Sequence, residues 1–428
     1  MEKYKYLIIG GGAAGTSAAE TIRQKDSVAT IAIVSDEIHP LYSRVMLSKP
    51  NFFLGKIPFE QIWLKGEKWY SDNSITFIGG KTADFLDPTN KVVTLNSSEK
   101  IKYEKLLIAV GVRTKTWQTN GSDKKGIYSL RTLEDGRAIM EAIKNAKRGV
   151  TIGGGFISFE MADLLKLAGL DTTMLLRESY FWEGVLDEAS GIIIEQALSR
   201  SGIRIIKNTE VIEVMGGDPS TGSEQECVSG VILKDGSKIE CELVITGIGV
   251  VPPQEGWLEQ AGIEIKGGIL ANEFLETSVK DIWTAGDIAE YKDLLLEENI
   301  QLGNWVNAHE QGRVAGLNMA ASFDELNIQK NPFKFVSFYT TQGVGISVAF
   351  VGDARPLPNR IIIQRGSPEI NSYGRILIVG CELVGATLIN RTSELTTLAK
   401  LIEKNVDVST HHSKLADPNF NLKELLPK

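Results

Sequence analysis

The chain has 428 residues, of which 43% are hydrophobic and 23% are charged, and its formal net charge is -8. This length suits roughly two or three domains, and the composition, with 42 glycines, is typical of a soluble α/β protein. The negative charge argues against a nucleic-acid partner, because phosphate binding needs a basic surface. No apolar run is long enough to span a bilayer and no signal-like segment opens the chain, so we expect a cytoplasmic protein without a membrane span.

The first predicted unit is a strand, a glycine turn, a helix and a second strand. An apolar run at 6–10 predicts a buried parallel strand, the small residues at 13–24 predict a helix, and 30–37 predicts the next strand. Two parallel strands joined by a crossover helix make a βαβ unit. The chain therefore begins with the element order of a nucleotide-binding domain.

The glycines of this unit fit the G-x-G-x-x-G pattern. Gly10 makes the turn, Gly12 lets a pyrophosphate approach the backbone, and Gly15 lets helix and strand pack closely. The N-terminus of the helix then presents free N–H groups to the phosphates. Asp36 or Glu37 follows the second strand and can accept from a ribose hydroxyl. A glycine turn without a ligand is the alternative, but strand, helix and acidic residue all stand where a dinucleotide needs them.

The same order of elements recurs at 149–179, where Gly169 is placed to end the helix. Gly153 and Gly155 keep the first two glycine positions, and Ser158 stands at the third. Two such units in tandem imply two dinucleotides or two halves of one site.

The residues after the second strand of this unit bear on the choice of coenzyme. Leu176 stands where an NADH-preferring site usually has its acidic residue. Arg177 can pair with a 2′-phosphate, which favours NADPH, while Glu178 leaves NADH open. A solvated charge without a ligand is the alternative for Arg177.

Further patterns lie between and after the two units. They predict strands at 91–95, 105–111, 202–208 and 242–253, and helices at 133–147 and 303–321. The stretch 216–226 is rich in turn formers and predicts an exposed loop. From about residue 331, alternating apolar residues predict a separate, largely antiparallel domain. The sequence thus predicts an α/β fold with two Rossmann-like dinucleotide-binding domains and a C-terminal α+β domain.

Four motifs together resemble the family of FAD and NAD(P)H oxidoreductases that share the pyridine nucleotide-disulfide oxidoreductase fold. They are the first glycine turn, 153–160, 281–287 and 106–114, where Val110 stands at a position at which threonine is commoner. The resemblance covers essentially the whole chain. It implies an FAD-binding domain at 1–112 and 241–330, an NAD(P)H-binding domain at 113–240, and a C-terminal interface domain at 331–428.

Within this family, 39–53 is similar to the segment in ferredoxin and rubredoxin reductases, apoptosis-inducing factor and the flavin domain of nitrite reductase. The stretches 303–320 and 415–426 look most like the rubredoxin reductase and nitrite reductase branch. Disulfide and peroxide reductases carry a redox cysteine in the first part of the chain, but Cys227 is the first cysteine here. The resemblance implies a flavoprotein reductase that passes hydride from NAD(P)H to FAD and electrons on to a redox protein or an iron–sulfur partner subunit.

Two other functions are kept open. One is a redox-sensing binding protein that resembles apoptosis-inducing factor, and the other is a disulfide or peroxide reductase, against which the absent cysteine counts. The cysteines Cys227, Cys241 and Cys381 form neither a CxxC pair nor a metal-ligand cluster, and the histidines show no metal spacing, so we expect no metal. A homodimer is left open.

The resemblance assigns roles to individual residues. Lys49 and Glu160 match a lysine–glutamate pair beside flavin N5, where hydride arrives; two unrelated surface residues are the alternative. Asp287 matches a contact to the FAD ribityl or pyrophosphate region, and the helix near Asn307 would aim its N–H groups at the flavin. Trp305 would cover a cofactor face or would be an ordinary core residue. The predicted cofactor-binding set is completed by Ala14, Arg44, Val110, Gly111, Arg113, Phe156, Ile157, Gly247, Gly249 and Gly286.

Overall fold

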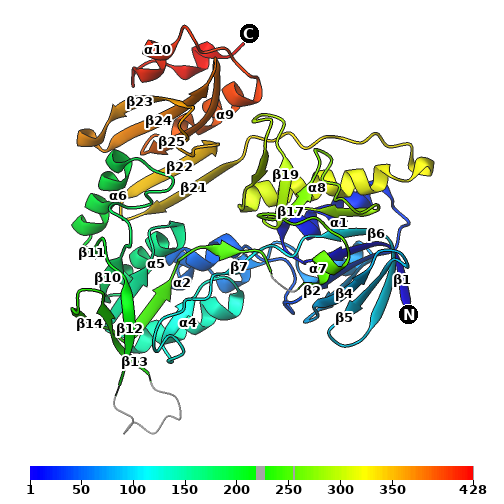
Figure 1. The fold of residues 1–428 in the computed structure, drawn as a ribbon, viewed down its shortest axis with the longest axis horizontal. Helices are drawn as coiled ribbons and strands as arrows, with labels where there is room; N and C mark the ends of the chain where they lie inside the picture. Colours follow the sequence, from blue (N-terminus) through cyan, green and yellow to red (C-terminus); the bar gives the residue numbers. More distant parts are fainter. Residues whose placement is uncertain (218–226, 254–255, 428) are drawn as a thin grey trace. The chain divides into compact units, whose positions relative to one another are not determined.

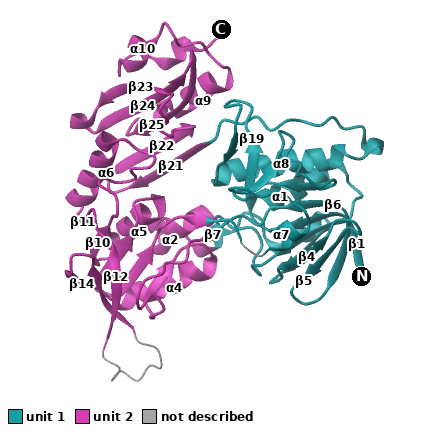
Figure 2. Cartoon of the chain, in the orientation of Figure 1, with its two compact units in different colours: residues 1–43, 60–113, 251–337 teal, residues 44–59, 114–250, 338–428 magenta. Residues whose placement is uncertain are grey.

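The computed structural model describes residues 1–217, 227–253 and 256–427, which form two compact units (Figure 2). The first unit comprises 1–43, 60–113 and 251–337, and the second comprises 44–59, 114–250 and 338–428. The chain thus crosses between the units several times, as a protein with one domain inserted into another must.

A seven-stranded sheet forms the centre of the first unit (Figure 1). In spatial order its strands are β3 (Ile75–Gly79), β2 (Ile31–Ser35), β1 (Glu2–Ile9), β6 (Lys100–Ile108), β5 (Val92–Leu95) and β4 (Ala83–Asp87), and β18 (Ile282–Thr284) pairs with β6. The strands β1, β2, β3, β6 and β18 pair in parallel, and β4 and β5 add an antiparallel edge. Every residue of β2 is buried, as a parallel strand covered on both faces requires.

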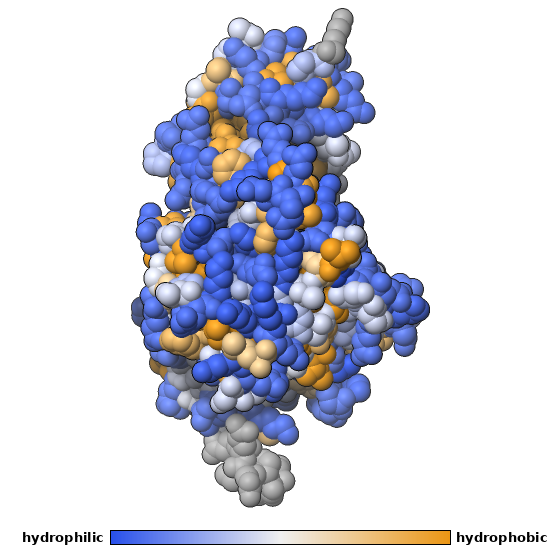
Figure 3. Space-filling view, turned by 90° about the vertical axis from the view of Figure 1, so that its right-hand side faces the viewer, coloured by the Kyte–Doolittle hydropathy of each residue, from blue (hydrophilic) through white to orange (hydrophobic). Residues whose placement is uncertain are grey.

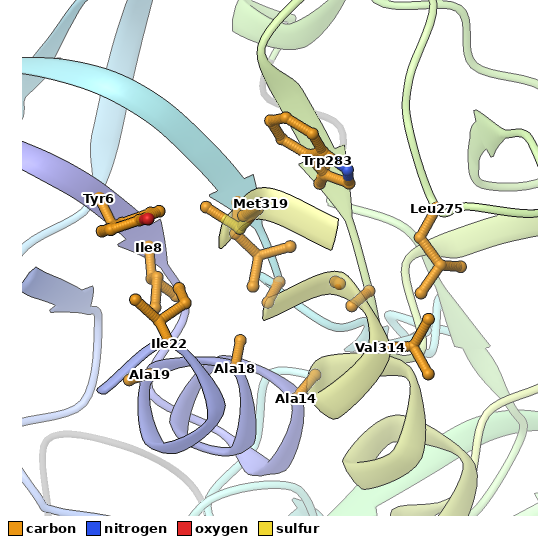
Figure 4. Close-up of a cluster of buried hydrophobic side chains, with 14 of the residues drawn as sticks. Tyr6, Ile8, Ala14, Ala18, Ala19, Ile22, Leu275, Trp283, Val314 and Met319 are labelled. Atoms are coloured by element: carbon orange, nitrogen blue, oxygen red, sulfur yellow. The ribbon is translucent and has the colours of Figure 1, made fainter. Parts of the chain in front are cut away.

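Two helices with small residues pack against each other in this unit. They are α1 (Ala13–Lys25) and α8 (Trp305–Ala321). A Cβ added at Gly312 would lie 2.1 Å from the carbonyl oxygen of Ala14, and one at Gly316 would lie 2.6 Å from that of Ala18. Figure 4 shows Ala14 and Ala18 of α1 in the buried cluster that Val314 and Met319 of α8 complete. Only glycine allows this close approach, which brings α8 onto the helix that follows the first glycine turn.

The second unit contains a five-stranded parallel sheet. Its strands in spatial order are β11 (Arg204–Ile206), β10 (Asp171–Leu175), β9 (Arg148–Ile152), β15 (Leu243–Thr246) and β8 (Ile127–Ser129). The helices α4 (Leu133–Asn145), α5 (Phe156–Leu167) and α6 (Glu188–Arg200) belong to the same unit. Gly169 follows α5 with a φ of +92°, as predicted for the residue that ends this helix. The strand β15 pairs with β9 in the sheet of the second unit, and the chain returns to the first unit at 251.

The C-terminal residues of the second unit form an antiparallel sheet, which confirms the prediction. The order is β21 (Phe338–Gly343), β22 (Ile346–Gly352), β25 (Glu382–Ile389), β24 (Ser372–Val379) and β23 (Ile361–Ser367). The fully buried guanidinium of Arg365 donates to the carbonyl oxygens of Leu415 (3.1 Å) and Phe420 (2.8 Å) and to the carboxylate of Glu394. One arginine therefore holds the chain end on this sheet.

Shorter elements complete the described chain. They are α2 (Pro50–Phe53), α3 (Glu67–Asp72), α7 (Trp257–Gln260), α9 (Leu395–Glu403) and α10 (His412–Ala416), a sheet of β12 (Val211–Gly216), β13 (Val228–Leu233) and β14 (Lys238–Glu240), a sheet of β17 (Ile269–Ala271), β19 (Ala289–Lys292) and β20 (Asn299–Gln301), and the pair β7 (Arg113–Thr114) and β16 (Val250–Val251). Most of the predicted loop at 216–226 lies outside the described residues.

None of the helices in the described ranges is both long enough and apolar enough to cross a membrane. On the face drawn in Figure 3, apolar residues are scattered among hydrophilic ones.

Candidate functional site

The first glycine turn leaves an open space in front of α1. Gly10 has a φ of +118°, and an added Cβ would lie 2.1 Å from the carbonyl oxygen of Ala109. A Cβ at Gly15 would lie 1.9 Å from the carbonyl oxygen of Gly10, so both positions require glycine. Gly12 is the N-cap of α1, has an ordinary φ of -76° and no side-chain cap, and a Cβ there would meet nothing within 4 Å. This open helix N-terminus fits the pyrophosphate of a dinucleotide.

The second turn repeats this geometry with one exchange. Gly153 has a φ of +113°, and Gly155 is the uncapped N-cap of α5 with open space at its Cβ position. Ser158 replaces the third glycine and donates from Oγ to the carbonyl oxygen of Ile152 over 3.1 Å. A Cβ at Gly247 would lie 2.3 Å from that Oγ. Glycine at 247 therefore makes room for serine at 158. We call each open helix N-terminus, at Gly12 and at Gly155, a glycine cradle. The second cradle fits a pyrophosphate as the first does.

The acidic residues after β2 differ in their surroundings. The Glu37 carboxylate accepts a hydrogen bond from the Tyr42 hydroxyl over 2.6 Å. Asp36 is exposed and accepts from the backbone N–H of Glu37 over 3.0 Å. Both residues lie in the same unit as the first glycine turn, so either carboxylate is available in the part of the chain predicted to bind FAD.

The residues after β10 divide into one core residue and two polar ones. Leu176 is fully buried, in a cluster with Phe159 against which Trp182 packs. A carboxylate at 176 would therefore be buried, and Leu176 serves the core whatever coenzyme binds. The Arg177 side chain is 74% exposed, and its Nη2 lies 3.2 Å from Oε1 of Glu178. Arg177 and Glu178 are therefore the two polar side chains that directly follow Leu176.

Residues 281–309 include the motif at 281–287 and the start of α8. Gly286 is buried with a φ of +85°, and its N–H donates to the Gln311 side chain over 2.6 Å. The helix starts at Trp305, close to Asn307, and its N-cap residue Asn304 accepts a hydrogen bond from the Asn307 N–H over 2.9 Å. One of the N–H groups expected to face the flavin is therefore already bonded.

The remaining residues of the predicted set lie in both units. Trp305 stacks on His309 with ring centroids 5.3 Å apart, and the side chain of Asp287 is partly buried. Arg44 lies in the second unit and donates to the carbonyl oxygen of Arg131 over 2.6 Å. The others are Ala14, Val110, Gly111 and Arg113 in the first unit, and Phe156, Ile157 and Gly249 in the second.

Glu160 has the most elaborate surroundings of the predicted site residues. Its carboxylate lies on α5 and is 2% exposed. Lys49 donates from Nζ to Oε1 and Ser48 donates from Oγ to Oε2. Tyr339 and Thr341 of β21 also donate to Oε1, the former over 3.3 Å. The lysine–glutamate pair expected from the sequence therefore forms, and Ser48 and one further segment, β21, complete its surroundings.

Sequence reasoning missed Ser48, Tyr339 and Thr341. The hydroxyl residues at 339 and 341 alternate along a predicted strand, which puts both on one face, but no local pattern shows what that face meets. Burial and the nearby Glu160 carboxylate raise the pKa of the Tyr339 hydroxyl above its ordinary value, so it remains a donor at neutral pH. Burial likewise raises the pKa of the Asp163 carboxyl, which lies one turn further along α5.

The three cysteines differ in their exposure. Cys227 and Cys381 are exposed, and burial raises the pKa of the buried Cys241 thiol to about 12. All three cysteines are free. Across the part of the chain that the structure describes, no group of three or more His, Cys, Asp or Glu side chains could hold a metal ion.

Comparison with known proteins agrees with this geometry. Residues 4–312 match the pyridine nucleotide-disulphide oxidoreductase family. The NADH-rubredoxin oxidoreductase of Clostridium acetobutylicum is 31% identical over 409 residues, which cover 95% of this chain and 96% of that protein. The nitrite reductase [NAD(P)H] of Bacillus subtilis is 28% identical over 96% of this chain, which spans 48% of its length. A ferredoxin reductase structure from Rhodopseudomonas palustris has a TM-score of 0.88 at 24% identity over 99% of this chain and 100% of that one, which shows the shared fold.

The chain belongs to the pyridine nucleotide-disulphide oxidoreductase family. It is an FAD-dependent oxidoreductase that uses NAD(P)H, as its family and its relatives show. The predicted fold class and the predicted cofactors are confirmed.

Proposed function

We propose that the protein is a flavoprotein reductase that takes hydride from NAD(P)H onto FAD and delivers electrons to a small redox protein or a partner subunit. The observation that carries this proposal is the pair of open glycine cradles, one in each unit. Two dinucleotide sites in one chain are what a nicotinamide-dependent flavoprotein needs. The relative named for rubredoxin supports a small redox protein as the electron acceptor.

Each cradle has a separate task in this proposal. FAD, when bound, accepts two electrons as hydride and releases them to one-electron acceptors. The backbone at Gly12, with the polar residues Asp36, Glu37 and Asp287 of the same unit, would hold FAD. The backbone at Gly155 would hold the pyrophosphate of the nicotinamide coenzyme, and the N–H groups at the start of α5 would face its negative charge.

Lys49 and Glu160 would orient the nicotinamide at the hydride-transfer step. Glu160 is almost fully buried and Lys49 retains a side-chain exposure of 25%, so the lysine is the member of the pair that a ligand can reach. The carboxylate compensates the ammonium charge in a partly desolvated place. The pair can therefore fix a polar group of the coenzyme without an unpaired charge.

An external acceptor is supported by the places of the cysteines in the sequence, because none comes before Cys227. Exchanging Cys227 and Cys381 for serine and Cys241 for alanine should leave coenzyme-driven reduction of an artificial acceptor or of rubredoxin within about twofold of the parent rate, since no thiol is needed as a relay. Steady-state kinetics of the triple variant check this. If the variant folds, binds FAD and is bleached by coenzyme but no longer reduces the acceptor, a thiol relay exists and the proposal is wrong.

Anaerobic reduction by NADH or NADPH, followed by stopped-flow reoxidation with a panel of acceptors, tests the proposed function directly. A reductase reoxidises fast with one class of redox protein, in an encounter that is weak and sensitive to salt. A redox sensor resembling apoptosis-inducing factor would keep a long-lived reduced complex and turn over slowly with every acceptor.

A homodimer is a separate proposal, which sedimentation of the FAD-bound protein would check.

The choice of coenzyme is proposed to depend on Arg177 and Glu178, with a lean to NADPH. Arg177→Gln should raise the KM for NADPH about tenfold and leave that for NADH nearly unchanged, because a guanidinium pairs with the 2′-phosphate. Glu178→Gln should act in the opposite sense, since it removes a ribose acceptor and a charge that repels the phosphate. Steady-state kinetics with both coenzymes measure the two ratios, and equal changes for NADH and NADPH in either variant would contradict this assignment.

A further inference from the structure

The first strand of the C-terminal sheet meets the helix that carries Glu160. Side chains alternate along a strand, so residues 339, 341 and 343 of β21 share one face. On α5, Phe156, Glu160 and Asp163 follow the i, i+4, i+7 spacing of one helix face. These two faces contact each other.

All three positions of this strand face lie against α5. The rings of Tyr339 and Phe156 have centroids 4.0 Å apart, and the Tyr339 hydroxyl reaches Glu160. Thr341 is buried and donates to the same carboxylate oxygen. A Cβ added at the next position, Gly343, would lie 3.1 Å from Oδ2 of Asp163, so glycine lets the strand lie close to the helix.

The donors from β21 share an acceptor with Lys49. Lys49, Tyr339 and Thr341 all donate to Oε1 of Glu160, whereas Ser48 donates to Oε2. If Ser48 and Lys49 were its only hydrogen-bond donors, the Glu160 carboxylate could rotate about its side-chain torsions. The hydroxyls of Tyr339 and Thr341 are fixed by the sheet, so the carboxylate has one orientation in which it accepts from every donor.

We propose that β21 is a built part of the hydride-transfer site, with Tyr339 and Thr341 as positioning residues that hold the Glu160 carboxylate toward Lys49. This inference rests on the proposed function and gives the C-terminal domain a task in it. The domain acts through Glu160 and needs no contact of its own with a cofactor.

The test compares two substitutions of one kind on opposite faces of β21. Thr341→Val removes the donor at nearly constant shape, and Thr340→Val makes the same change at an exposed position. Thr341→Val should slow flavin reduction by saturating coenzyme about tenfold with unchanged FAD content, as expected for a lost hydrogen bond to a charged group. Thr340→Val should match the parent protein. Tyr339→Phe, which removes only a hydroxyl, provides a second variant should Thr341→Val fail to fold.

The same change in a Lys49→Met background separates positioning from general damage. If Thr341 acts through the Lys49–Glu160 pair, Thr341→Val should slow this variant no further. A loss equal to that of Thr340→Val, or a tenfold loss that persists without Lys49, would overturn the proposal.

A cofactor-independent measurement keeps this inference distinct from the proposed function. In urea unfolding, the shifts of midpoint caused by Thr341→Val and Glu160→Leu should be smaller together than their sum, because both remove the same hydrogen bond. Additive shifts would overturn the positioning role. A coupled pair in a protein that binds no FAD would instead refute the proposed function and leave the contact between β21 and Glu160 standing.

Discussion

Replacing Gly12 with valine is expected to give a folded protein that no longer holds FAD. The residue has a φ of -76°, which any amino acid adopts, and a Cβ there meets no protein atom within 4 Å. The side chain would instead fill the space through which a pyrophosphate reaches the N–H groups of α1. FAD affinity should fall by about a hundredfold or more, a loss of several hydrogen bonds to a charged group. Flavin absorbance per protein chain and the unfolding temperature measure the two halves of the prediction.

Two other glycines provide matched comparisons. Gly66 is the N-cap of α3, with a φ of -80° and open space at its Cβ position, so Gly66→Val makes the same change away from the cradle. This variant should keep its FAD. Gly155→Val should also keep FAD but bind NAD(P)H weakly, because its cradle lies in the other unit. A yellow Gly12→Val protein with a full complement of flavin would show that the first cradle does not hold the pyrophosphate.

The local elements of this fold could be predicted because their causes are local. The small residues after Gly10 and the apolar run before it produce α1 and β1, and the equivalent pattern produces α5 and β9. A glycine after a helical pattern marks its end, as the φ of +92° at Gly169 shows. Alternation from 333 onward likewise predicted an antiparallel sheet.

Sheet membership could not be predicted in the same way. The residues at 243–246 form the buried strand β15, and they would suit a buried parallel strand in the sheet of either unit. The sequence of this stretch alone therefore does not predict which sheet it joins. It lies beside β9, and the second unit continues to residue 250. The fit of Ser158 against Gly247 depends on the same pairing, because these two residues come into contact only when β15 lies beside β9.

The candidate site shows the same division. Lys49 and Glu160 were found because they match a family pattern at fixed positions. Ser48, Thr341 and Tyr339 are separated from Glu160 by 112, 181 and 179 residues, and their hydroxyls resemble those of any polar residue on a strand or turn. Only tertiary packing brings them to one carboxylate.

The pair itself yields the second prediction, that Lys49→Met and Glu160→Gln each slow flavin reduction by NAD(P)H by about a hundredfold while FAD stays bound. The first change removes the only member of the pair that solvent reaches, and the second removes the charge that holds it. Stopped-flow bleaching of the flavin at saturating coenzyme measures each rate. Lys56→Met, an exposed lysine in the same segment, should leave the rate unchanged.

The double variant decides whether the two residues act together. Without Glu160 the ammonium loses the acceptor that fixes its position, so removing both groups should cost little more than removing either one. FAD content should stay constant throughout, since the first cradle belongs to the other unit. Losses that multiply in the double variant would assign the two residues independent tasks, and unchanged rates would place hydride transfer away from this pair. A loss shared by both residues, and extended to Thr341 through the same carboxylate oxygen, would make Glu160 the residue through which two other segments, the one at 48–49 and β21, control one reaction.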